Sequence, residues 1–394
     1  MKILMLVKYP PIQGGVSVDA YWTAQFLAAN GHDVHVLTNA PEVENEYKIH
    51  LSEYDESLLT GYWNRGFVKL HTTYRDPNHV FIPQSNPSVS KLYGVGLEVC
   101  KAFCPDVIWS YYFEPFGLVS LLLSKSTGIP YVFKHAGSDL GRLMQTPQLR
   151  PAYCEILKNA AAILTRKIHF DNFVELGVSP ERLWRSFAIR LPEQLFSLVE
   201  LKSPSDVFQL GIYGKTGPAK GTKQLIEAAI ILKKEGFRLR IRAHWGGRDI
   251  NQYLNLITAN SLEDVFEVLP FIPHWKIPDF IKSCDMVCFL ENKFKIKFHN
   301  TFVPLEVIAC GIPLMTTLEV QSKASYQNIF VDDKNCFLIK EPVNGENIAI
   351  RIKEAFTSLR SGRIERPAFD AVLFHAEAIF KLTQTIKRLE RIIG

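Results

Sequence analysis

Short apolar runs alternate with stretches of helical periodicity along the whole chain. KILMLV at 2–7 is the first such run, and an amphipathic segment at 18–30 separates it from the next one, DVHVLT at 33–38. This alternation is typical of a parallel sheet covered by helices on both faces. It predicts an α/β protein built from doubly wound, Rossmann-like sheets.

The same rhythm occurs twice. In the first half we predict strands at 2–7, 33–38, 67–73, 107–112, 131–136 and 161–165, with helices at 18–30, 88–103 and 116–126. In the second half we predict strands at 207–214, 238–245, 266–270, 285–290 and 312–317, with helices at 222–235, 250–260, 276–283, 302–310 and 368–393.

The length also requires more than one domain. A chain of 394 residues is too long for one ordinary hydrophobic core. A polar stretch with two prolines lies between the two halves, near 188–206, and reads as a linker. We therefore predict an N-terminal domain at 1–190, a linker at 191–205 and a second domain at 206–375.

Composition narrows the class of protein. Apolar residues make up 47% and charged residues 22%, as in a folded globular protein. The net charge of +5 is not gathered into blocks, so we predict no nucleic-acid partner, although a basic chain suits anionic ligands or a peripheral contact with an anionic membrane surface. No run reaches the roughly 18 apolar residues of a spanning helix, and we expect a cytoplasmic protein.

The seven cysteines do not form a metal motif. Two pairs have four-residue spacing, in LEVCKAFCPDV and SCDMVCFL, but both lie in apolar surroundings without a second cluster of histidine or cysteine. We predict reduced thiols and no metal site.

The first stretch that could form a ligand-binding site follows the first predicted strand. Pro10-Pro11 turns the chain, and Gly14-Gly15 precedes a helix whose unpaired N–H groups suit a phosphate. A turn that merely needs permissive glycines explains the same residues equally well. The dinucleotide fingerprint G-x-G-x-x-G is absent.

The second stretch is YVFKHAGSDLGR. His135 ends a strand at the carboxyl edge of the sheet, where open α/β sheets bind ligands. Ser138 and Asp139 are suited to cap the following helix.

The third stretch, YGKTGPAKGTKQL at 213–225, contains a false phosphate-loop signal. The first glycine of that pattern is replaced by Gln209. What remains is a pair of lysines, Lys215 and Lys220, on either side of a Gly217-Pro218 turn. Two ammonium groups in a crevice would neutralise a diphosphate and the charge that grows as a sugar leaves it. The alternative is two solvated loop lysines.

The fourth stretch is HNTFVPLEVIACGIPLMTT. We expect Thr301 to cap a helix and Glu306 to lie one turn inside it. A carboxylate there can accept hydrogen bonds from a vicinal diol, such as a ribose. The alternative is an ordinary helix-surface charge.

In this order, the four stretches resemble the retaining glycosyltransferases of family 4, which have the GT-B fold of two Rossmann-like domains facing across a cleft. The resemblance covers nearly the whole chain. It is carried by Gly14-Gly15 with Gly31-His32-Asp33-Val34, by His135 with Gly137-Ser138-Asp139, by Gly214-Lys215 with Lys220-Gly221, and by Glu306 within EVIACGIP.

The resemblance implies a hexosyltransferase that moves a sugar from a nucleoside-diphosphate-sugar donor to a glycan, lipid or small-molecule acceptor, without a metal or cofactor. The donor would sit on the second domain, the acceptor on the first, and the last helix, 376–394, would pack back across the first domain. The implied catalytic residues are His135, Lys215 and Lys220, and the implied donor-binding residues are Gly14, Gly15, Gly214, His299, Asn300, Thr301, Phe302, Val303 and Glu306.

The roles are also implied. Lys215, in place of the family's usual arginine, would hold the diphosphate with Lys220, while Gly15 would approach the phosphates, His135 the donor sugar and Glu306 the ribose.

One departure from the family concerns the donor sugar. The family has a glutamate eight residues before Glu306, and this chain has Phe298. The nearest earlier acid, Glu291, is expected to be too distant without a loop rearrangement, so His299 or Asn300 would supply the contact. Two rival interpretations follow: a nucleotide-sugar 2-epimerase of the same fold, and a non-catalytic nucleotide-sugar-binding homologue.

Overall fold

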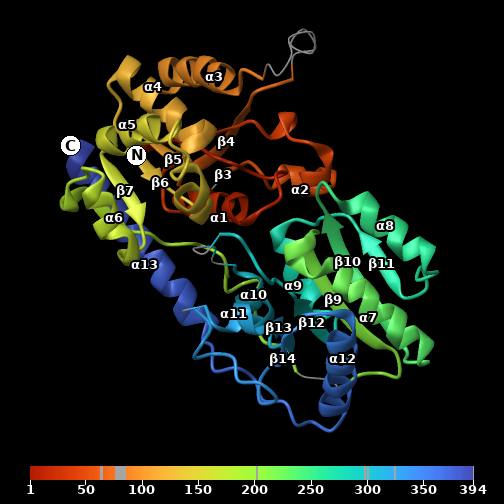
Figure 1. Cartoon of the computed structure of the whole chain (residues 1–394). Helices are drawn as coiled ribbons and strands as arrows, with labels where there is room; N and C mark the ends of the chain where they lie inside the picture. The colour runs from red at the N-terminus through yellow and green to blue at the C-terminus, as the bar shows by residue number, and fades with distance from the viewer. Residues whose placement is uncertain are drawn as a thin grey trace.

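Two sheets, one in each half of the chain, form the framework of the protein (Figure 1). The computed structural model describes residues 1–62, 65–75, 86–200, 203–296, 299, 301–323 and 325–393. The first sheet has the strand order β3-β4-β2-β1-β5-β6-β7-β8, and the second has the order β11-β10-β9-β12-β13-β14. Among the described strands of the two sheets, all pairings are parallel except that of β3 with β4. The predicted fold class, two doubly wound α/β domains, is confirmed.

The bounds of the elements are as follows. The first sheet contains β1 (Lys2–Leu6), β2 (Asp33–Thr38), β3 (Gly61–Tyr62), β4 (Phe67–Thr72), β5 (Val107–Tyr111), β6 (Tyr131–Lys134), β7 (Ala162–Thr165) and β8 (Leu183–Arg185). Its helices are α1 (Gly15–Ala29), α2 (Glu53–Ser57), α3 (Ser88–Phe103), α4 (Leu118–Thr127), α5 (Arg150–Asn159) and α6 (Phe170–Glu175). The second sheet contains β9 (Phe208–Lys215), β10 (Leu239–Gly246), β11 (Phe266–Leu269), β12 (Met286–Phe289), β13 (Leu314–Thr317) and β14 (Phe337–Ile339). Its helices are α7 (Thr222–Lys234), α8 (Ile250–Ala259), α9 (Ile277–Lys282), α10 (Val303–Ala309), α11 (Leu318–Gln321) and α12 (Gly345–Arg360), and α13 (Ala371–Ile393) follows.

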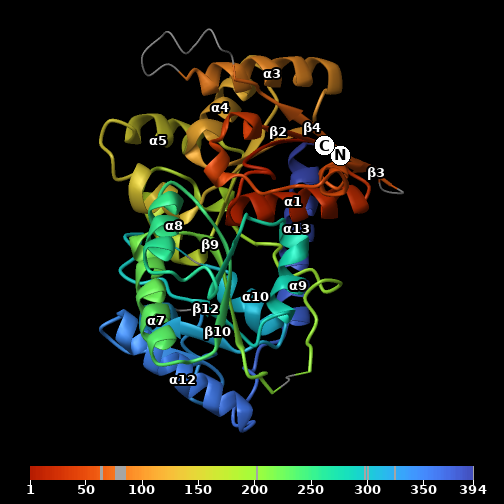
Figure 2. The same cartoon turned by 90° about the vertical axis from the view of Figure 1, so that its right-hand side faces the viewer.

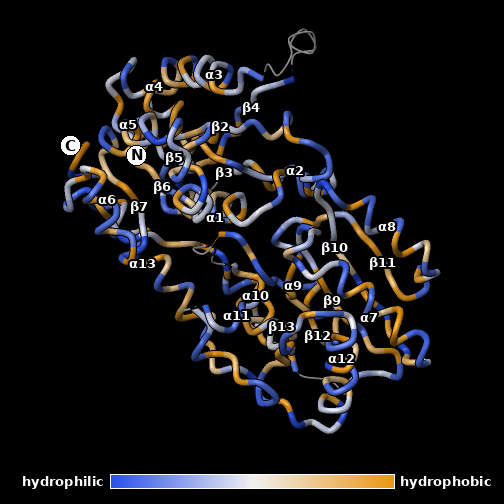
Figure 3. Tube along the Cα trace, viewed as in Figure 1, coloured by the Kyte–Doolittle hydropathy of each residue, from blue (hydrophilic) through white to orange (hydrophobic). Residues whose placement is uncertain are grey.

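Each sheet is buried on both faces because successive strand residues point to opposite sides. In β1, Ile3 and Met5 pack with α1 and α13, whereas Leu4 and Leu6 pack with the layer of α3, α4, α5 and α6. The second sheet is covered by α7, α8 and α12 on one face and by α9, α10 and α11 on the other. The apolar colouring of the strands in Figure 3 follows this burial.

The last helix returns to the first domain. α13 leaves the second half of the molecule and runs along the first (Figures 1 and 2). Ala378, Leu382, Ile386 and Leu389 of this helix belong to the same core as α1 and β1. The first domain is therefore completed by the end of the chain. No helix in the described part of the chain is both long and apolar enough to cross a membrane.

Several contacts join the domains beside the cleft. The backbone N–H of His50 donates to Phe271 O at 2.8 Å, and the N–H of Gly247 donates to Glu46 O at 2.7 Å. Asp55 in α2 accepts from the indole of Trp275 at 2.9 Å. These bonds join the segment after β2 to the loops after β10 and β11.

Candidate functional site

A cavity of about 1000 Å³ lies between the domains and is lined by residues from both. Its walls include the loops after β1, β6, β7 and β8 on one side and those after β9 and β12 on the other. These loops follow the carboxyl ends of parallel strands, the edge at which open α/β sheets bind ligands.

Three lysines from the two domains converge in the cleft. Lys215 ends β9, Lys220 follows the Gly217-Pro218 turn, and Lys8 follows β1. Withdrawal from water, and then the charges of Lys8 and Lys220, lower the pKa of Lys215 to about 8. Its Nζ lies 5.1 Å from the centre of the Tyr47 ring. The sequence pattern identified Lys215 and Lys220 but not Lys8, which directly follows the buried apolar run of β1.

A buried carboxylate positions Lys220. Glu291 is fully buried, and its Oε2 lies 2.5 Å from the Nζ of Lys220. Its Oε1 lies 2.5 Å from the Nζ of Lys323 and 3.3 Å from Nδ1 of His299. Burial alone would raise the pKa of Glu291, but the His299 hydrogen bond and the Lys220 charge hold it well below its usual range.

Glu291 is not on the cavity wall itself, and it reaches the site through Lys220 and His299. It follows β12, whose carboxyl end lies beside the lysine loop, so the sheet brings together two residues that are 71 positions apart. Phe298 and Asn300 lie outside the described residues.

The lysine loop requires a glycine where it joins α7. Gly221 has φ 68°, a left-handed conformation that side chains rarely adopt. A Cβ added there would lie 2.5 Å from the Cβ of Leu290. This close approach seats the loop against the chain that carries Glu291.

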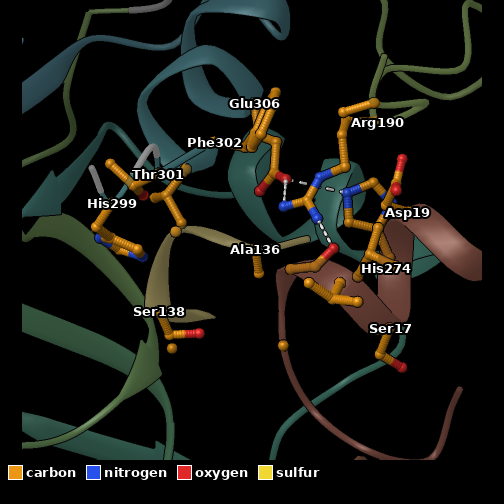
Figure 4. Close-up of a pocket in the computed structure, with 18 of the residues that line it drawn as sticks. Ser17, Asp19, Ala136, Ser138, Arg190, His274, His299, Thr301, Phe302 and Glu306 are labelled. Atoms are coloured by element: carbon orange, nitrogen blue, oxygen red, sulfur yellow. Dashed lines mark hydrogen bonds and ion pairs between the residues drawn. The ribbon is translucent and has the colours of Figure 1, made fainter. Parts of the chain in front are cut away.

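Glu306 is buried in a hydrogen-bonded cluster, not on a helix surface (Figure 4). Its Oε2 accepts from the Tyr213 hydroxyl at 2.8 Å, and its Oε1 lies 3.2 Å from Nε2 of His274 and 3.4 Å from Nη2 of Arg190. Burial would raise its pKa, but His274, Arg190 and Tyr213 together lower it to about 2. Glu306 is therefore ionised at neutral pH.

The tautomer of His274 is set by the other domain. The indole N–H of Trp22, in α1, donates to Nδ1 of His274 at 3.0 Å. Burial lowers the pKa of His274. Because Nδ1 accepts, the neutral ring carries its proton on Nε2 and donates it to Glu306. A chain of hydrogen bonds from Trp22 through His274 thus links α1 to the carboxylate of Glu306.

Arg190, in the segment between the domains, was not predicted as a site residue. Figure 4 shows its guanidinium between Glu306 and the start of α1. It donates to the backbone carbonyl of Gly15 and lies 4.6 Å from the centre of the Phe302 ring. A Cβ at Gly15 would lie 3.1 Å from Nη1, so the second glycine of the Gly14-Gly15 pair makes room for this contact.

His135 lies at the end of β6, as expected, and is held by Thr165. Its Nε2 lies 2.6 Å from the Thr165 hydroxyl. Burial lowers its pKa to about 4, so the imidazole is neutral at pH 7. Asp139 accepts from the N–H of Ala136 at 2.8 Å, whereas Ser138 makes no side-chain capping bond.

A buried ion pair also lines the cavity. Lys134 Nζ lies 2.5 Å from Asp19 Oδ2, and Oδ1 of Asp19 accepts from the N–H of Ile189 at 2.9 Å. Neither residue was predicted.

Most of the predicted site residues line the cleft. Those on the cavity wall are the predicted catalytic residues His135, Lys215 and Lys220 and, of the predicted donor-binding residues, Gly14, Gly15, Gly214, His299, Thr301, Phe302, Val303 and Glu306. The expected cap at Thr301 was wrong, because the N-cap of α10 is Phe302 and no side-chain cap is present. No cluster of three or more potential metal ligands occurs within the described ranges.

Two domain families match the chain. The family described as "Glycosyl transferase 4-like domain" matches residues 14–183, and the family described as "Glycosyl transferases group 1" matches residues 196–361. No curated protein matches.

Solved structures share the fold over the full length. HepE from Anabaena in complex with UDP-glucose is 16% identical with a TM-score of 0.62, over 98% of this chain and 100% of that one. Sucrose-phosphate synthase from Thermosynechococcus elongatus is 14% identical with a TM-score of 0.64, over 100% and 98%. A glycosyltransferase from Rickettsia africae is 12% identical with a TM-score of 0.59, over 100% and 98%.

Proposed function

The chain is a glycosyltransferase composed of a 4-like domain and a group 1 domain, and from this premise we propose that it transfers a sugar from a nucleoside-diphosphate sugar with retention of anomeric configuration. The observation that carries the proposal is the convergence of Lys8, Lys215 and Lys220 on one cleft from both domains. Of these three lysines Glu291 pairs with Lys220 alone, so a donor diphosphate would supply the negative charge that balances Lys8 and Lys215.

In the proposed reaction, the bond between the anomeric carbon and the diphosphate oxygen breaks, and its electron pair stays on the leaving oxygen. The lysines stabilise that charge as it develops. The acceptor hydroxyl attacks from the same face, and its proton passes to the leaving diphosphate. Each carboxylate on the described cleft wall is engaged by a cation, which favours this direct route over attack by a protein nucleophile.

The lysine cluster also supports transfer without a divalent metal, because it places positive charge where a metal would otherwise balance the diphosphate. We propose that activity persists in EDTA. Activity that disappears in EDTA and returns with Mg²⁺ or Mn²⁺ would contradict this.

The donor is tested first. A thermal-shift screen with UDP, GDP, ADP and their sugars identifies the base, since a ligand that binds only the folded state raises its stability. UDP-glucose is the first candidate because the Anabaena structure was solved with it. Labelled donor is then incubated with and without acceptors, and NMR gives the anomeric configuration of the product. An isomerised nucleotide sugar formed without acceptor would support the epimerase interpretation.

Lys220→Ala tests the site. We expect kcat/KM to fall at least about 100-fold, the size of effect seen when a transition-state charge contact is lost, while circular dichroism stays unchanged. Lys223→Ala is the matched control, because Lys223 is exposed and pairs with Glu227 outside the cleft wall. Unchanged turnover in Lys220→Ala would refute the assignment.

A further inference from the structure

The cleft holds more positive charge than a donor requires. Among the described residues, nine lysine and arginine side chains line it, against three carboxylates, Asp19, Glu306 and Glu377. This excess, nine less three, is larger than the net charge of +5 on the whole chain, so basic residues are concentrated in the cleft. Each carboxylate is already paired, with Lys134, Arg190 and Lys381 respectively.

The six other cations on the wall form two groups, and among them Lys220 pairs with Glu291, which lies behind the wall. Lys8, Lys215 and Lys220 are one group, because the charges of Lys8 and Lys220 act on Lys215. Arg166, Lys167 and Arg185 are the other and all belong to the first domain. We call this second group the β7–β8 basic cluster.

The β7–β8 basic cluster is organised by the sheet. β7 and β8 are parallel neighbours in which Thr165 pairs with Arg185, and Arg166 and Lys167 follow directly. Arg166 is also close enough for its charge to act on His135, at the end of the adjacent strand β6. The three cations therefore share the carboxyl edge of three consecutive strands with His135.

These cations have no carboxylate to balance them. Among the residues that the structure describes, no ion pair joins Arg166, Lys167 or Arg185 to an acid. The guanidinium fork of arginine matches the geometry of a phosphate or carboxylate and binds either with two parallel hydrogen bonds. The first group, with Lys215 and Lys220 on the second domain and Lys8 on the first, is the one assigned to the donor diphosphate in the proposed function.

We propose that the acceptor of this enzyme is anionic, with a phosphate or carboxylate group bound by the β7–β8 basic cluster. This inference rests on the proposed transfer reaction. The anionic group anchors on Arg166 and Arg185, which directs the attacking hydroxyl toward His135 and the donor sugar. A neutral acceptor would leave these three exposed cations without an anionic partner at the cleft wall.

Calorimetry on the UDP-saturated protein tests the proposal with glucose, glucose 6-phosphate and glucuronate as matched probes. We expect at least one anionic probe to bind the wild type at least tenfold more tightly than glucose. In Arg166→Gln/Arg185→Gln this preference should fall at least tenfold, while the Kd for UDP stays within about twofold of the wild-type value. Preference for glucose 6-phosphate indicates a phosphate acceptor, and preference for glucuronate indicates a carboxylate acceptor.

The control is Lys101→Gln/Lys125→Gln, which removes two charges from α3 and α4 of the same domain outside the cleft wall and should leave both affinities unchanged. Equal binding of all three probes to the wild type, or an undiminished preference in the arginine variant, would overturn the anionic acceptor while leaving the transferase assignment intact. Failure of the wild type to bind any nucleoside diphosphate would instead overturn the proposed function.

Discussion

The lowered pKa of Lys215 predicts that donor binding weakens at moderately alkaline pH. The pKa falls from 10.5 to about 8 because the amine is withdrawn from water next to Lys8 and Lys220. In the free protein, Lys215 thus loses its proton as the pH rises through 8. A bound diphosphate favours the charged form, so binding above pH 8 must take up a proton.

The magnitude follows from the protonated fraction. With a pKa of about 8, roughly nine-tenths of the Lys215 side chains are charged at pH 7 and roughly one-tenth at pH 9. The Kd for UDP should therefore rise about tenfold between these two values. The terminal phosphate of UDP does not complicate the comparison, because it titrates near pH 6.

Lys215→Arg is the discriminating variant. A guanidinium stays protonated throughout this range. Calorimetry of UDP binding at pH 7, 8 and 9 should show the tenfold loss in the wild type and a nearly flat profile in Lys215→Arg. If the variant weakens as much as the wild type, the titrating group is not Lys215; Lys8, whose pKa burial also lowers, is then tested in the same way.

Two further predictions concern the buried carboxylates. Glu291→Gln removes the charge that positions Lys220, so we expect kcat/KM for the donor to fall at least about tenfold, with partial recovery in Glu291→Asp; equal turnover in steady-state assays would contradict this role. Glu306→Gln should lower the free energy of unfolding at pH 7 by about 3 kcal/mol, because the pKa of Glu306 is lowered from 4.5 to about 2. This stabilisation is present above pH 4.5 and is lost as the pH falls through 2, so urea unfolding should show wild type and variant converging in that range.

Most strands of the two sheets could be predicted from the sequence because each one is marked by its own apolar run. Every strand predicted from an apolar run is present, since a strand buried on both faces needs apolar residues at each position. The two-residue β3 and the three-residue β8 and β14 were not predicted, because runs this short contain no periodicity to detect. The first helix was predicted to start three residues late, since Gly15 does not favour a helix and begins one here beside Arg190.

Site residues could be predicted from the sequence where a single loop contains the whole pattern. Lys215 and Lys220 sit on either side of a Gly-Pro turn, and that spacing indicates charge for a ligand. Glu291 could not be found in this way, because its partner Lys220 is brought to it only by strand order in the sheet. Arg190 and the chain of hydrogen bonds from Trp22 through His274 depend on how the two domains meet, and no local pattern encodes that.

The return of α13 to the first domain has a consequence for biosynthesis. During translation the first sheet emerges long before the helix that covers part of it, and the whole second domain is made in between. Domains usually fold as units in the order of synthesis. Here the apolar face of the first domain that α13 covers stays exposed until residues 371–393 leave the ribosome. Nascent chains stalled before α13 should accordingly recruit holdase chaperones, and they should release them once the helix docks.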